Sequence, residues 1–229
     1  TGRVSKIPER DHFESFVARE SIRFLQRFSG RQPFFLICSF LKPHDPFMPA
    51  ERFAQMFSPA DMHLPQSWTN VDPKTAPEEV RKSITRNAPT PELRNREEAL
   101  KRIAYYYANL AQMDDCAGAV LRELTRLGLA DDTVVIYTSD HGEMLGAHGL
   151  WQKFQFYEES CGVPLIIRAP GVTKAGVCDT PVTQVSLLPT LAKLCDIPIK
   201  AKLVEDDFMQ QLHDPAAARS KPVYAEYDL

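Results

Sequence analysis

Apolar side chains recur at helical spacing in three parts of the chain, which predicts three amphipathic helices. The stretches are residues 11–28, 97–127 and 185–195. Gly128 follows the second stretch and predicts its end, because glycine readily adopts the left-handed backbone that terminates a helix. A shorter helix is expected near residues 156–160.

Continuous or alternating apolar runs between these stretches predict strands. They occupy residues 33–40, 133–137, 164–167 and 223–227. Strands that alternate with helices favour an α/β fold, in which a mostly parallel sheet is sandwiched by helices. Residues 47–91 have a different character, since prolines are frequent and polar residues separate short apolar groups. This composition predicts a long irregular insert, which is typical of a functional loop.

Polar side chains follow two of the predicted strands. Asp140 and His141 come shortly after residues 133–137, and His44 follows residues 33–40. Ligands gather at the carboxyl ends of strands in open α/β sheets. Asp140 offers a hard carboxylate oxygen to a divalent cation, and His141 offers an imidazole. The residues alone leave other interpretations open: Asp140 as a helix cap, His141 as a solvated or outer-shell group, and His44 as a hydrogen-bonded loop residue.

Four segments in this order resemble the sulfatase branch of the alkaline-phosphatase superfamily. They lie at residues 42–47 (KPHDPF), 139–142 (SDHG), 145–153 (LGAHGLWQK) and 163–171 (VPLIIRAPG). The resemblance runs from about residue 34 to residue 198, most of the chain. Each segment alone is a weak signal, whereas the ordered set is specific.

The resemblance implies a role for each matching residue. His44 would bind the sulfate and protonate the leaving oxygen, and Lys153 would bridge the sulfate and the nucleophile. Asp140 and His141 would be metal ligands. The resemblance favours Ca²⁺, while ligand chemistry leaves Mg²⁺, Mn²⁺ and Zn²⁺ open. His148 has two interpretations, as a substrate contact or as a residue that holds its own loop.

Neighbouring residues have simpler interpretations. Lys153 could itself be a solvated helix-face lysine. Lys42 is expected on the surface and Trp151 in the packed core. The pair Asp114-Asp115 is expected to cap or to form ion pairs rather than to bind metal.

The family pattern is incomplete in this sequence. Sulfatases carry a Cys- or Ser-x-Pro/Ala-x-Arg motif whose first residue becomes formylglycine, and no cysteine here fits it; the early Asp-Asp metal pair is absent too. The chain is therefore interpreted as residues 1–229 of a partial catalytic domain, incomplete at both ends, with formylglycine expected outside it. Alone, it is expected to be inactive.

The resemblance predicts a sulfuric ester hydrolase that acts on a small sulfated substrate. One alternative is a phosphonate monoester or phosphodiester hydrolase of the same superfamily. Another is a non-catalytic binding module derived from the fold. The resemblance also favours a periplasmic or secreted protein; the substrate and the oligomeric state stay open.

The composition of the chain limits the classes of partner and site that are expected. The net charge is −3, with 27 basic and 30 acidic residues, so the sequence indicates no nucleic-acid partner. No apolar run approaches the roughly 20 residues that span a bilayer. The five cysteines are scattered and form no CxxC pair.

Overall fold

The computed structural model contains the whole chain and divides into two compact units. It describes residues 2–28, 32–68, 77–78, 81–82, 95–203, 206–218 and 222–226. The first unit comprises Thr1–Asp131 with Gly142–Gln155, and the second comprises Asp132–His141 with Phe156–Leu229. Much of the predicted insert, at residues 69–76, 79–80 and 83–91, lies outside the described residues.

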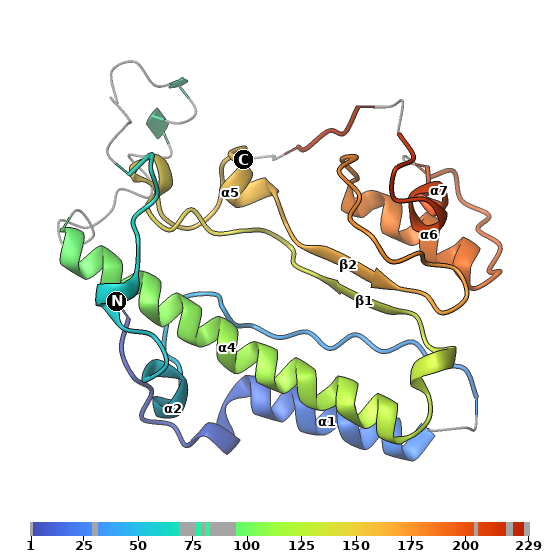
Figure 1. Cartoon of the computed structure of the whole chain (residues 1–229), viewed down its shortest axis with the longest axis horizontal. Helices are drawn as coiled ribbons and strands as arrows, with labels where there is room; N and C mark the ends of the chain where they lie inside the picture. The colour runs from blue at the N-terminus through green and yellow to red at the C-terminus, as the bar shows by residue number, and fades with distance from the viewer. Residues whose placement is uncertain are drawn as a thin grey trace. The chain divides into compact units, whose positions relative to one another are not determined.

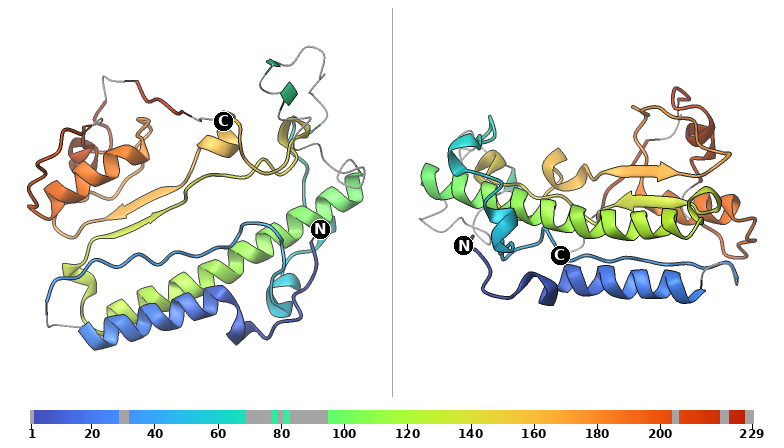
Figure 2. Two further views of the ribbon diagram at one scale, coloured as in Figure 1. Left: turned by 180° about the vertical axis from the view of Figure 1, so that it is seen from behind. Right: turned by 60° about the horizontal axis from the view of Figure 1, so that its bottom comes forward.

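Two long helices lie side by side in the first unit (Figure 1 and Figure 2): α1 (Phe13–Phe28) and α4 (Arg96–Arg126). The Asn95 side chain caps α4, because its oxygen accepts the backbone N–H groups of Glu97 at 2.8 Å and Glu98 at 3.3 Å. Gly128, with φ of 70°, follows its end. Both helices confirm the predictions from helical spacing.

The first unit also contains short helices whose bounds fall within the described residues. They include the 3-10 helices η1 (Glu9–Asp11), η2 (Pro59–Asp61) and η5 (Ala147–Gly149) and the α-helix α2 (Glu51–Ala54). Phe53 of α2 packs with Ala108 of α4 in a buried cluster. Arg52 of α2 forms an ion pair with Asp115 of α4 at 2.6 Å, so Asp115 pairs as expected.

Residues 33–40 run extended, but no strand in the described part of the chain pairs with them. Phe34 packs against Phe24 of α1, with ring centroids 5.8 Å apart. Phe35 and Ile37 point away and are 74% and 71% exposed. The apolar run predicted a buried strand, yet a strand is buried only where neighbours cover its other face and its edges.

Lys42 lies in the interior, although the sequence placed it at the surface. Its Nζ is 3.6 Å from Oε2 of Glu14, and the two side chains are only 12% and 3% exposed. Nζ also donates to the carbonyl oxygen of Met48 at 3.3 Å. Burial lowers the pKa of Lys42 from its ordinary value of 10.5, and the Glu14 carboxylate opposes this shift.

Replacing Glu14 by glutamine is expected to lower the free energy of unfolding by roughly 3 kcal/mol, because the variant leaves the Lys42 charge buried without its partner. Urea unfolding followed by circular dichroism measures the change. In the parent, stability should rise with pH between the lowered pKa of Lys42 and 10.5, because the unfolded chain binds more protons there.

Glu20→Gln on the same helix is the matched control. Glu20 pairs with Arg23 at 2.5 Å, but both side chains are largely exposed. Such a pair contributes at most about 1 kcal/mol, so little change is expected. Equal decreases in the free energy of unfolding of the two variants would contradict the stabilising role of the buried pair of Lys42 and Glu14.

The second unit contains a two-stranded antiparallel ribbon. Strand β1 (Val135–Thr138) pairs with β2 (Leu165–Arg168), and Val135 lies opposite Arg168. The sequence predicted both strands at nearly these positions, but as buried members of a mostly parallel sheet. The described strands pair antiparallel instead, and both are half-exposed, since a ribbon of two strands covers little of its own surface.

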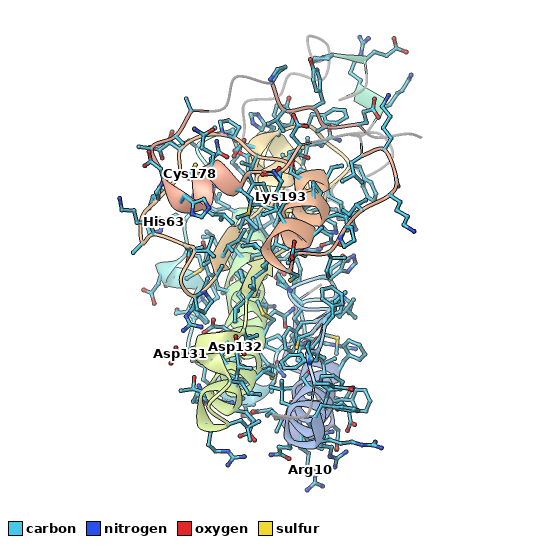
Figure 3. The ribbon with its side chains drawn as sticks, turned by 90° about the vertical axis from the view of Figure 1, so that its right-hand side faces the viewer. Arg10, His63, Asp131, Asp132, Cys178 and Lys193 are labelled. Atoms are coloured by element: carbon cyan, nitrogen blue, oxygen red, sulfur yellow. The ribbon has the colours of Figure 1, made fainter. Side chains whose placement is uncertain are left out.

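Among its described residues the second unit also contains short helices: α5 (Glu158–Cys161), η6 (Gln184–Ser186), α6 (Leu187–Leu194) and α7 (Met209–His213). In α6, the Thr190 hydroxyl accepts the backbone N–H of Phe208 at 3.2 Å. Lys193, labelled in Figure 3, pairs with Asp207 at 2.6 Å. Both contacts hold the segment before α7 against α6.

The end of the chain differs from its prediction. Residues 222–226 form no strand, and Tyr227 lies outside the described residues. No helix within the described ranges is both long and apolar enough to cross a membrane.

Candidate functional site

A turn rich in proline positions His44. Its backbone N–H donates to the carbonyl of Leu41 at 3.0 Å, and the peptide bonds before Pro43 and Pro46 are cis. The imidazole Nδ1 lies 2.7 Å from the carbonyl oxygen of Asp45. A carbonyl oxygen can only accept, so Nδ1 carries a proton and donates it. In the neutral ring Nε2 then holds a lone pair.

Lys153 forms a hydrogen bond with that lone pair. Its Nζ lies 2.6 Å from Nε2 of His44, a contact between residues 109 positions apart in the chain. An ammonium group has only donors, so Lys153 donates and His44 accepts. The structure thus brings together the two residues predicted to bind sulfate. We call this contact the His44–Lys153 pair.

A closed loop carries Lys153 to this position. The backbone N–H of Met144 donates to the carbonyl of Gln152 at 2.8 Å, and that of Gly146 donates to Leu150 at 2.7 Å. Gly146 has φ of 91°, and a Cβ there would lie 2.4 Å from the Trp68 ring. Only glycine fits this position, for conformation and for space.

Backbone strain is concentrated in the same loop. Four of the five described non-glycine residues with positive φ lie between positions 145 and 154: Leu145 (45°), His148 (54°), Gln152 (69°) and Phe154 (76°); Asp196 (53°) is the fifth. Such conformations raise the energy by about 1–3 kcal/mol each and gather at functional sites, where the surrounding structure imposes them. The strain therefore supports a functional interpretation of the loop.

His148 is tied to the loop through its backbone. Its N–H donates to Oγ of Ser67 at 3.1 Å. This contact involves the backbone and not the imidazole, so both interpretations of His148, as a residue that holds its own loop and as a substrate contact, stay predictions.

Asp140 and His141 lie in the second unit, directly after β1. The Asp140 carboxylate is 85% exposed; its Oδ1 accepts the backbone N–H of His141 at 3.0 Å, and its Oδ2 lies 3.5 Å from Nε2 of His141. An exposed carboxylate and a neighbouring imidazole fit part of a divalent-metal site. Among the described residues no group of three or more potential metal ligands is found, so these two residues could supply only two ligands of such a site.

Two charged residues that contact the loop before Lys153 were missed from the sequence. Glu143 is half-buried, and its Oε1 accepts the backbone N–H groups of Gln152 at 2.5 Å and Leu145 at 3.4 Å. Burial raises its pKa. Arg102 is buried in α4 between the apolar residues Ala99 and Ile103. A charged residue on the apolar face of a helix was the signal that could have identified it.

Comparison with known proteins agrees with this geometry. The family model described as Sulfatase matches residues 9–197. The chain is 31% identical over 195 residues to a choline-sulfatase from Rhizobium meliloti (strain 1021), an alignment that covers 84% of this chain. It is 32% identical over 198 residues to an arylsulfatase from Clostridium perfringens (strain 13 / Type A), which covers 83% of this chain.

A solved structure shows the same fold. The chain matches a phosphonate monoester hydrolase from Silicibacter pomeroyi with a TM-score of 0.83 and 24% identity, over 94% of this chain and 46% of the other. This confirms the predicted alkaline-phosphatase-like α/β class. The chain spans 38% of the choline-sulfatase and 40% of the arylsulfatase, less than half of either relative.

Proposed function

This chain belongs to the sulfatase family, and from that premise we propose that the full-length protein containing it is a sulfuric ester hydrolase. The observation that carries the proposal is the 2.6 Å contact between Lys153 Nζ and His44 Nε2. A cation and an imidazole at this distance can both reach the oxygens of one sulfate group.

In the proposed reaction Lys153 and His44 have separate tasks. Cleavage breaks the bond between sulfur and the ester oxygen, which must then take up negative charge or a proton. A sulfate oxygen that accepts the ammonium N–H of Lys153 frees the lone pair on Nε2 of His44, which then takes up a proton from solvent and makes the ring an imidazolium. His44 then donates this proton to the departing oxygen as a general acid, while the Asp45 carbonyl keeps Nδ1 in place.

The remaining chemistry requires groups beyond this pair. We propose that Asp140 and His141 would be two ligands of a divalent metal, with Ca²⁺ as the metal, which would supply charge stabilisation when bound. Formylglycine, located outside this chain, would supply the attacking hydroxyl. We propose that the 229-residue chain is part of a catalytic domain and is inactive alone. By family resemblance, we propose that the protein acts in the periplasm or outside the cell on a small sulfated substrate.

Kinetics with two probes test the function. The full-length protein, supplied with calcium, is assayed with an aryl sulfate and with an aryl phosphonate monoester that has the same leaving group. A higher kcat/KM for the sulfate is expected. Both groups are tetrahedral and carry one negative charge at neutral pH, so discrimination depends on how the site receives the carbon substituent of the phosphonate and on the nucleophile.

The opposite preference would move the assignment to a phosphonate monoester hydrolase, the activity named for the solved structure of the same fold. Absence of turnover with either probe, in a protein that binds metal, would favour the non-catalytic binding module.

A further inference from the structure

The His44–Lys153 pair joins the loop that contains His44 (the His44 loop) to the loop that ends at Lys153 (the Lys153 loop). One buried aromatic residue lies close to each of these residues in the sequence and anchors its loop, and a buried cation lies between the two rings. Phe47 follows His44 by three positions and is fully buried, and Trp151 precedes Lys153 by two positions and is also buried. The guanidinium Cζ of Arg102 lies 4.8 Å from the Phe47 ring centroid and 5.0 Å from the Trp151 ring centroid. One planar cation thus contacts both anchors.

One carboxylate near each of the two loops attracts Arg102. Its guanidinium is attracted by Glu143, which accepts backbone N–H groups from the Lys153 loop, and by Asp45, which is adjacent to His44. The Arg102 side chain is held in the interior of α4, where the residue is only 8% exposed. Its Nε has no hydrogen-bond partner in the described residues. This burial is costly for a cation unless ring faces and nearby carboxylates offset it.

We propose that Arg102 is a positioning residue that holds the His44 loop and the Lys153 loop together, so that Nε2 and Nζ stay in contact. It reaches the sulfate only through these two residues. The proposal rests on the proposed function for its kinetic consequence, but the contact itself can be observed without any substrate.

The test uses the full-length protein labelled with [¹⁵N]histidine, in which His44→Gln assigns the His44 signals. Arg102→Met keeps the length of the side chain and removes its charge and its planar group. In this variant the Nε2 signal of His44 is expected to lose the shift caused by the Lys153 hydrogen bond, and kcat/KM should fall by roughly 10- to 100-fold. Phe47→Leu, which retains Arg102 and removes one ring, should produce a smaller change in the same direction.

A kinetic cycle separates positioning from general damage. If Arg102 acts through the pair, Arg102→Met in a Lys153→Ala background should lower kcat/KM by less than threefold, because the interaction that it supports is already gone. Arg122→Met, at an exposed position of the same helix, is the matched control and should leave the His44 signals unchanged.

An unchanged Nε2 signal in folded Arg102→Met would overturn the proposal, as would fully additive losses in the cycle. If Arg102→Met does not fold, Phe47→Leu decides by the same signal. A lost Nε2 shift in a protein that hydrolyses no sulfate ester would uphold the positioning role and refute the proposed function.

Discussion

Lys153→Ala in the full-length protein is expected to lower kcat/KM for sulfate-ester hydrolysis by about 10²- to 10³-fold, the usual effect of removing one fixed donor from a developing oxyanion. Lys153 supplies the cation nearest to Nε2 of His44, at 2.6 Å. Steady-state kinetics with an aryl sulfate measures the loss. Lys153→Arg should recover only part of the rate, because the guanidinium keeps the charge but is larger and planar.

Lys101→Ala controls for the removal of a lysine. Lys101 lies on α4, 44% exposed in its side chain, and pairs with Glu98 at 3.8 Å. An exposed pair of this kind contributes little, so activity should stay within about twofold of the parent. A Lys153→Ala protein that kept full activity would contradict the role assigned to the His44–Lys153 pair.

Asp140→Asn is expected to lower both metal content and activity in the full-length protein. The carboxylate is the hard oxygen ligand of the proposed site, and the amide oxygen that replaces it is neutral. Loss of metal-based charge stabilisation corresponds to several kcal/mol, so kcat should fall by roughly 10²- to 10³-fold. Metal analysis by mass spectrometry after dialysis, together with kinetics over a calcium titration, measures both effects.

Asp132→Asn provides the comparison for Asp140. Asp132 is exposed in the 3-10 helix η4 (Ala130–Asp132) that precedes β1, where Figure 3 labels it beside Asp131. This variant should retain both metal and activity. Equal metal content in the Asp140→Asn protein and the parent would exclude Asp140 as a ligand.

The helices of this protein could be predicted because their signals are local. The apolar spacing of residues 97–127 and the stop at Gly128 fall within one stretch of chain, and α4 begins and ends within one residue of that prediction. Residues 11–28 were likewise predicted as a helix, and α1 begins two residues later, at Phe13, and ends at Phe28. Such signals act within a few turns of helix and need no information about the rest of the fold.

Burial of single residues could not be predicted in this way. Lys42 was placed at the surface because lysine is rarely buried without a partner, and its partner Glu14 lies 28 residues away in α1. Whether the strands pair in parallel or antiparallel also could not be predicted from the local sequence pattern. The runs at residues 133–137 and 164–167 show that strands form, but an apolar run is the same whether its neighbour is parallel or antiparallel.

The candidate site was found through resemblance rather than periodicity. The position of His44 after a predicted strand made it a candidate, but it left open that His44 is a hydrogen-bonded loop residue and that Lys153 is a solvated lysine. The contact between them is a tertiary one over 109 residues, and only the ordered set of motifs indicated it. Arg102 was overlooked because it matches no motif, although its place on the apolar face of α4 was visible in the sequence.

The most direct test of the central claim is a titration of the full-length protein with inorganic sulfate, followed by the ¹⁵N signals of His44. If the His44–Lys153 pair receives the sulfate group, the Nε2 signal should shift in a saturable manner, and Lys153→Ala should abolish the shift. If sulfate inhibits hydrolysis while both ring-nitrogen signals of His44 stay unchanged at saturation, the anion binds elsewhere and the account is contradicted.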